Sequence, residues 1–108
     1  MLHMITSEAV VAEDALGMIY GGTVDSTQTW VETSAMLVTV CKGKPFGTYF
    51  ILVLTDAVTA EDLVELQRLE VELGKKLDDC VVERERYDKP HRFFPGSRSF
   101  QLVTLYAG

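Results

Sequence analysis

The chain has 108 residues, of which 47% are apolar and 24% charged, and its formal net charge is −6 at neutral pH. This length and composition are those of one ordinary globular domain, which excludes a largely disordered chain. The absence of any apolar run near the ~20 residues of a membrane span predicts that the protein has no transmembrane helix. The acidic balance also argues against general nucleic-acid affinity, because binding to phosphates requires cations.

The first third of the chain has the least regular pattern. Residues 7–16 could form a short N-terminal helix capped by Ser7, and residues 18–24 could form an edge strand. Residues 25–28 have the composition of a turn. From Trp30 onward, the β-branched residues predict either a backward extension of the next strand or a helix.

A β-hairpin is predicted in the middle of the chain. Residues 34–42 and 48–55 are rich in Val, Thr, Leu and Ile, and they flank a turn at 43–47 that contains two glycines and a proline. The second of these strands is apolar on both faces, which predicts a central position in the sheet.

The clearest helical pattern covers residues 60–76. Thr59 is placed to cap the N-terminus, and Glu61 and Asp62 occupy the first turn, where negative charge meets the positive end of the helix dipole. Leucines recur at spacings of three and four and predict one apolar stripe, which we interpret as the side of a core helix rather than of a docking helix. These leucines are Leu63, Leu66, Leu69, Leu73 and Leu77.

Two further strands are predicted at residues 80–87 and 100–106. Strands grouped in hairpins with few helices favour a mainly antiparallel sheet. We therefore expect a single α+β domain over residues 1–108, built of two layers. Its sheet would have four to five strands, with the long helix on one face and a short N-terminal helix.

The two cysteines, Cys41 and Cys80, lie in apolar surroundings without the spacing of a redox or zinc motif. The first residues also lack the basic start and apolar core of a signal peptide. Both features favour free thiols in a reducing cytoplasm, although a disulfide between the two is not excluded. With a single internal histidine and no phosphate-binding loop, the sequence predicts neither a metal site nor a cofactor.

The most unusual stretch is the segment 84–98, which is basic in an otherwise acidic chain. It holds five of the ten Lys and Arg residues and only two acidic residues, so its charge is +3 and the rest of the chain carries −9. Guanidinium groups that converge here could bind a carboxylate or phosphate in a bidentate manner. The simpler alternative is that they form surface ion pairs with the protein's own carboxylates. The candidate arginines are Arg84, Arg86, Arg92 and Arg98.

Two consecutive aromatic residues, Phe93 and Phe94, interrupt the charges of this segment. On a strand both could not point inward, so we expect one to fill the core beneath the loop. The other would cover a pocket or contact a partner subunit, where aromatic and arginine side chains are favoured anchors. Alternatively, both cap the open end of the sheet.

His91 is a weak catalytic candidate. It lies between Lys89 and Arg92, and with Asp88 or Glu85 to orient it, it could act as a general base. Most histidines among cations are surface residues without a catalytic role, so we expect no catalysis.

Three functional hypotheses follow. The first is a non-catalytic binding or interaction module, a homodimer, that uses the segment 84–98 to engage an acidic partner surface or a small anion. The second is a small enzyme acting on an anionic substrate, which would require His91 and a carboxylate to converge on a pocket beside Arg84 or Arg86. The third is binding of single-stranded nucleic acid, which the interleaved arginines and aromatic residues suit but the charge of −9 elsewhere opposes.

Overall fold

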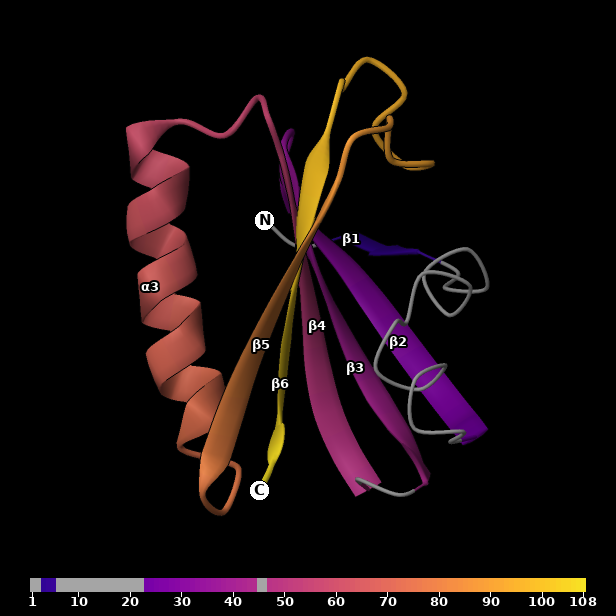
Figure 1. Cartoon of the computed structure of the whole chain (residues 1–108), viewed down its shortest axis with the longest axis vertical. Coiled ribbons are helices and arrows are strands. Elements are labelled where there is room, and N and C mark those ends of the chain that lie inside the picture. The colour runs from indigo at the N-terminus through magenta and orange to yellow at the C-terminus, as the bar shows by residue number, and fades with distance from the viewer. Residues whose placement is uncertain (1–2, 6–22, 45–46) are drawn as a thin grey trace.

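The computed structural model describes residues 3–5, 23–44 and 47–108. In this part of the chain, six strands form one antiparallel sheet in the order β1-β2-β3-β4-β6-β5, and one helix lies against it (Figure 1). The α+β prediction is confirmed, with six strands instead of four to five. The short helix predicted at 7–16 lies outside the described residues. The elements are β1 (His3–Ile5), β2 (Thr23–Thr33), β3 (Met36–Lys44), β4 (Gly47–Thr55), α3 (Ala60–Gly74), β5 (Cys80–Tyr87) and β6 (Phe100–Ala107).

Strand β2 corrects the interpretation of residues 25–28 as a turn. These residues lie inside β2, which is a strand of its own and pairs with β3 through Trp30 opposite Val38. Its polar residues alternate between the two faces: Gln28 is exposed, whereas Thr29 is buried. The hydrogen bonds to β3 therefore override a composition that favours turns.

The predicted hairpin is confirmed. Strands β3 and β4 pair from Met36 opposite Leu54 to Gly43 opposite Gly47. Gly47 has a φ of +70°, a conformation that residues with a side chain rarely adopt. Strand β4 lies between β3 and β6, and it is buried without interruption from residue 49 to 55, as expected for a central strand.

Helix α3 begins with the capping box that its sequence predicts. The Thr59 hydroxyl accepts a hydrogen bond from the Asp62 backbone N–H at 3.2 Å, and the Asp62 carboxylate accepts one from the Thr59 N–H at 2.9 Å. Leu66 and Leu69 are buried, but Leu63 is 46% exposed. Leu63, Leu66 and Leu69 are three residues apart, which is less than one turn of the helix. Leu63 and Leu69 therefore point in directions about 120° apart around the helix axis, and Leu63 does not face the sheet.

The helix connects β4 to β5 across one face of the sheet, since β6 lies between these two strands. Apolar residues are buried on both faces of the central strands. On the side of α3 the buried cluster consists of Met36, Val38, Phe50, Leu52, Leu54, Leu66, Leu69, Val103 and Leu105. On the opposite side, here called the far cluster, it consists of Leu37, Cys41, Tyr49, Ile51, Val53, Phe100, Leu102 and Tyr106.

The cysteines lie apart in this arrangement. Cys41 is buried in the far cluster, whereas Cys80 packs against the cluster on the side of α3 and is half-buried. The Cys80 thiol is free, so the two residues form no disulfide. No helix in residues 3–5, 23–44 and 47–108 is long and apolar enough to cross a membrane.

Candidate binding surface

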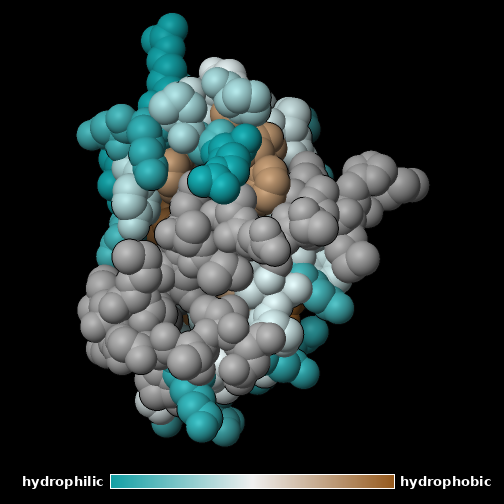
Figure 2. Space-filling model, turned by 90° about the vertical axis from the view of Figure 1, so that its right-hand side faces the viewer, coloured by the Kyte–Doolittle hydropathy of each residue, from teal (hydrophilic) through white to brown (hydrophobic). Residues whose placement is uncertain are grey.

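The basic segment is divided between a strand and a loop. Its first residues belong to β5, and residues 88–99 form the connection from β5 to β6, here called the tip loop. The tip loop lies at the upper end of the sheet in Figure 1, on the side away from α3. Figure 2 views the molecule from that side and shows apolar surface between strongly hydrophilic side chains at this end.

Buried polar groups give the tip loop a defined shape. His91 is fully buried and Ser97 is 8% exposed. The Ser97 hydroxyl accepts a hydrogen bond from the His91 backbone N–H at 3.1 Å and donates one to the Phe94 carbonyl at 2.6 Å. The Phe94 N–H donates to the His91 carbonyl at 2.9 Å, which closes a tight turn. These bonds pair the Ser97 hydroxyl with backbone groups of His91 and Phe94 inside the loop and hold its backbone in this turn.

The His91 ring lies among aromatic side chains instead of on the surface. Its centroid is 4.9 Å from that of Phe100, in an edge-on arrangement, and 5.7 Å from those of Phe93 and Phe94. Its Nδ1 atom accepts a hydrogen bond from the Phe93 backbone N–H at 3.1 Å, so this nitrogen carries no proton. The expectation that His91 is a surface residue is therefore wrong, because the aromatic rings and the backbone hydrogen bond hold it inside the loop.

Phe93 and Phe94 differ from the expectation that one points inward and the other outward. Both are partly buried and both pack against the far cluster. The expectation assumed the alternation of a strand, but the chain turns at residues 92–93 and 95–96. Consecutive side chains can then contact the same surface, as in the alternative in which both cap the end of the sheet.

Asp56 fixes the other end of the tip loop. One of its carboxylate oxygens accepts hydrogen bonds from the backbone N–H groups of Arg98 at 2.9 Å and Ser99 at 3.4 Å. The bond from Arg98 is the main reason that the pKa of Asp56 lies below its usual value. Sequence analysis did not identify Asp56. Its only signal was an aspartate directly after a strand, where such side chains often accept backbone hydrogen bonds.

Two of the four candidate arginines pair with carboxylates of the same chain. Arg84 Nη2 lies 2.7 Å from Glu70 Oε1, which joins β5 to α3. Arg86 Nε lies 3.2 Å from Asp88 Oδ1. For these two residues the structure supports the simpler alternative of surface ion pairs, and solvent screening leaves each pair little stabilising energy.

The remaining cations of the segment are Lys89, Arg92 and Arg98, here called the tip cations. All three are exposed, and none forms an ion pair with a carboxylate in the part of the chain that the structure describes. The Lys89 ammonium lies 5.7 Å from the centre of the Tyr87 ring. Within the described residues, the arginines of the segment on β5 are thus paired, whereas the cations of the tip loop form no ion pair.

A pocket of about 200 Å³ lies near the start of α3, below the tip loop. Arg86 and Asp56 are its charged residues, and its lining includes no tip cation. His91 is likewise not among the residues that line this pocket beside Arg86. The lining consists of Leu54, Thr55, Asp56, Val58, Leu63, Arg86, Ser99, Phe100 and Gln101.

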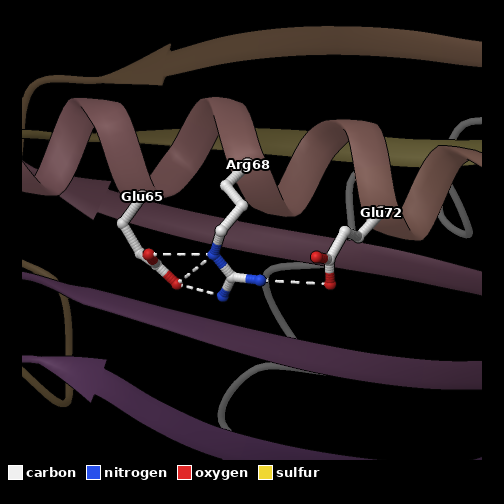
Figure 3. Close-up of polar contacts among 3 residues, drawn as sticks. All are labelled: Glu65, Arg68 and Glu72. Atoms are coloured by element: carbon white, nitrogen blue, oxygen red, sulfur yellow. Dashed lines mark hydrogen bonds and ion pairs between the residues drawn. The ribbon is translucent and has the colours of Figure 1, made fainter.

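A separate charged cluster runs along α3 (Figure 3). Arg68 lies between Glu65 and Glu72: its Nη1 is 3.1 Å from Glu72 Oε2, and its Nε donates to both carboxylate oxygens of Glu65 at 3.1 and 3.0 Å. These bonds lower the pKa of Glu65 and raise that of Arg68. All three side chains are substantially exposed, so the cluster neutralises charge on the helix surface but adds little to stability.

The chain matches no family model, no curated protein and no solved structure. Within the described residues, no group of three or more His, Cys, Asp or Glu side chains is arranged to hold a metal ion. Function is therefore inferred from the geometry of the tip loop and its surroundings.

Proposed function

We propose that this protein is a non-catalytic interaction module, acting as a homodimer, whose tip loop engages an acidic surface of a partner protein. The observation that carries the proposal is the set of exposed tip cations, which form no ion pair with the described residues. They are carried on a loop built around the buried His91 and Ser97, in a chain with a net charge of −6.

The order of the tip loop supports a role in binding. A flexible loop would lose conformational entropy on binding, and that loss would reduce its affinity. Backbone hydrogen bonds to the side chains of Ser97 and Asp56, together with the packing of the two phenylalanines, hold this loop before any partner arrives. On binding, therefore, only the side chains of the tip cations would lose conformational freedom, and the backbone of the loop would not.

An acidic protein surface suits this geometry better than a small anion does. A small anion needs several donors that converge on one concave site. The pocket offers one arginine, Arg86, and this residue is already paired with Asp88. The tip cations lie on a protruding loop, where an extended acidic surface can contact each of them separately.

Neither of the other hypotheses gains support. A binder of single-stranded nucleic acid needs exposed aromatic faces on which bases stack, whereas Phe93 and Phe94 pack against the far cluster. A general base must reach its substrate, whereas the His91 side chain is fully buried.

The proposal can be tested by a titration of the ¹⁵N-labelled protein with a hexaglutamate peptide, followed by NMR. We expect amide shifts confined to residues 88–99, which diminish as salt screens the charges. The variant Arg92→Ala/Arg98→Ala should lose most of the response while it keeps the wild-type spectrum elsewhere. The matched control is Lys42→Ala/Lys44→Ala, which removes the same charge from exposed residues at the end of β3.

Equal losses in both double variants would show that binding reflects net charge alone, and the proposal would be abandoned. Parallel titrations with inorganic phosphate and with a short oligothymidine probe the alternatives. A response to either of these ligands that exceeds the response to hexaglutamate would contradict an acidic protein partner.

A further inference from the structure

Helix α3 exposes large apolar side chains on its solvent side. Val64 is 67% exposed, Val71 is 58% exposed and Leu63 is 46% exposed. The fourth exposed large apolar residue of the described chain is Val82, at 42%, on the adjoining edge strand β5. Sequence analysis assigned α3 to the core only, and the spacing of seven residues between Val64 and Val71 was the overlooked signal.

Val64 and Val71 belong to a regular row on the helix. Ala60, Val64, Gln67 and Val71 follow one another at spacings of four, three and four, and all four are exposed. This spacing places side chains along one stripe, the arrangement by which two helices pack together in a coiled coil. The row, here called the outer seam, lies on a different side of α3 from the buried Leu66 and Leu69.

Charges beside the outer seam are largely neutralised within the same chain. Arg68 is held between Glu65 and Glu72, as Figure 3 shows, and Glu70 is bonded to Arg84 of β5. A second copy that approaches the seam would therefore meet little uncompensated charge in its middle.

The two ends of α3 carry opposite charge. Glu61 and Asp62 lie in the first turn, and Lys75 and Lys76 directly follow the last residue of the helix. An antiparallel second helix would place the acidic end of each helix beside the basic end of the other. The positive end of each helix dipole would also lie beside the negative end of the other dipole, which is electrostatically favourable. A parallel helix would bring like charges together at both ends.

The free edge of β5 is a less suitable contact. In an antiparallel pair formed by two copies of one strand, residues opposite each other lie on the same face of the sheet. Registers centred near the middle of β5 would then place glutamates opposite glutamates on one face and arginines opposite arginines on the other, which is unfavourable. The residues concerned are Glu83, Arg84, Glu85 and Arg86.

We infer that the protein forms a homodimer in which the outer seams of two α3 helices pack antiparallel. This inference deepens the homodimer of the proposed function by naming its surface. The tip loop lies on the side of the sheet away from α3, so the dimer would leave both tip loops open (Figure 1). Each dimer would offer two cationic loops to an acidic partner.

Sedimentation velocity over a range of concentrations tests the seam. We expect the wild-type chain to form dimers, and Val64→Gln/Val71→Gln to raise the dissociation constant at least about tenfold, equivalent to about 1.4 kcal/mol. Glutamine has a higher helix propensity than valine, so the variant should keep its helix, which circular dichroism checks. Lys42→Gln, at an exposed position on β3, serves as the control. A monomeric wild type, or a dimer unaffected by the double variant, would overturn the inference.

The antiparallel orientation has its own test. Glu61→Lys and Lys75→Glu should each weaken the dimer, because each places like charges at facing ends. The double variant Glu61→Lys/Lys75→Glu should restore wild-type affinity, although it opposes the helix dipole at both ends. Weak association in the double variant, or no effect of the single ones, would exclude this orientation.

The dimer through the outer seam and the binding role of the tip loop can be tested independently of each other. Arg92→Ala/Arg98→Ala should dimerise like the wild type. The variant Val64→Gln/Val71→Gln, although monomeric, should keep the response of residues 88–99 to hexaglutamate.

Discussion

Asp56 and His91 show how single residues determine the shape of the tip loop. Asp56 follows β4 directly and accepts backbone hydrogen bonds from the residues that lead into β6, so one carboxylate joins two connections at the same end of the sheet. His91 fills the interior of the loop, and its ring accepts the Phe93 N–H. In the proposed interaction, both residues would therefore act only through the position of the exposed cations.

The pH dependence of stability should reveal the contact made by Asp56. Its lowered pKa means that the ionised form stabilises the fold, a contribution present above the unfolded pKa of about 3.9 and lost as pH falls through the folded value. We expect Asp56→Ala to lower the thermal midpoint at pH 7, with a difference from wild type that shrinks below about pH 4. Asp56→Asn, which keeps an acceptor oxygen, should lose less. A difference that does not change with pH would contradict this role.

Helix α3 illustrates how one element can carry two kinds of surface. Its capping box fixes where it begins, and Leu66 and Leu69 pack onto the sheet. The outer seam of Val64 and Val71 faces away from that core. The spacing of the leucines alone does not show which of them are buried. Positions three residues apart are offset around the helix axis, so a series of them passes from the buried side to the exposed side.

Truncation of the leucines should separate the buried from the exposed side. We expect Leu66→Ala to reduce the free energy of unfolding by about 2–5 kcal/mol, because it leaves a cavity in a packed core. Leu63→Ala, on the half-exposed side, should have a clearly smaller effect, and Leu73→Ala an intermediate one. Urea unfolding of the three variants gives the comparison. Equal losses for Leu63 and Leu66 would show that the helix is rotated relative to the arrangement described here.

At the scale of the whole molecule, charge is separated by location. The net charge of −6 belongs to the whole chain, the two arginines of β5 pair with carboxylates of the same chain, and the tip cations form no ion pair with the residues that the structure describes. The sheet buries apolar residues on both faces of its central strands. Charged residues on a loop at the end of such a sheet can therefore be substituted without disturbing the buried core.

Alkylation of the native protein reports on the integrity of this core. Cys41 is 1% exposed, so we expect it to react with iodoacetamide only as fast as the domain opens. Cys80 is half-buried on the other side of the sheet and should react sooner. Mass spectrometry of the modified peptides measures both rates, and denatured protein supplies the reference. Faster modification of Cys41 than of Cys80 would contradict the packing of the far cluster.

Local patterns predicted much of the fold. The N-cap at Thr59, the hairpin around residues 43–47 and the bounds of β5 follow from interactions between residues close in sequence. Such interactions are the same wherever the segment lies in the domain. Two of the failures were the polar stretch 25–28 and the exposed Leu63, where pairing with β3 and the rotation of the helix decided the outcome.

By itself, the sequence determined the α+β class, the succession of strands and helix from β3 to β6, and the position of the basic segment. The tertiary structure alone decided which cations of that segment pair with carboxylates among the described residues. Arg84 meets Glu70, a residue fourteen positions away, and Asp56 binds the backbone of Arg98 across forty-two positions. Contacts of this kind depend on how the helix and the loops are placed on the sheet, and that placement is set by the packing of the whole core.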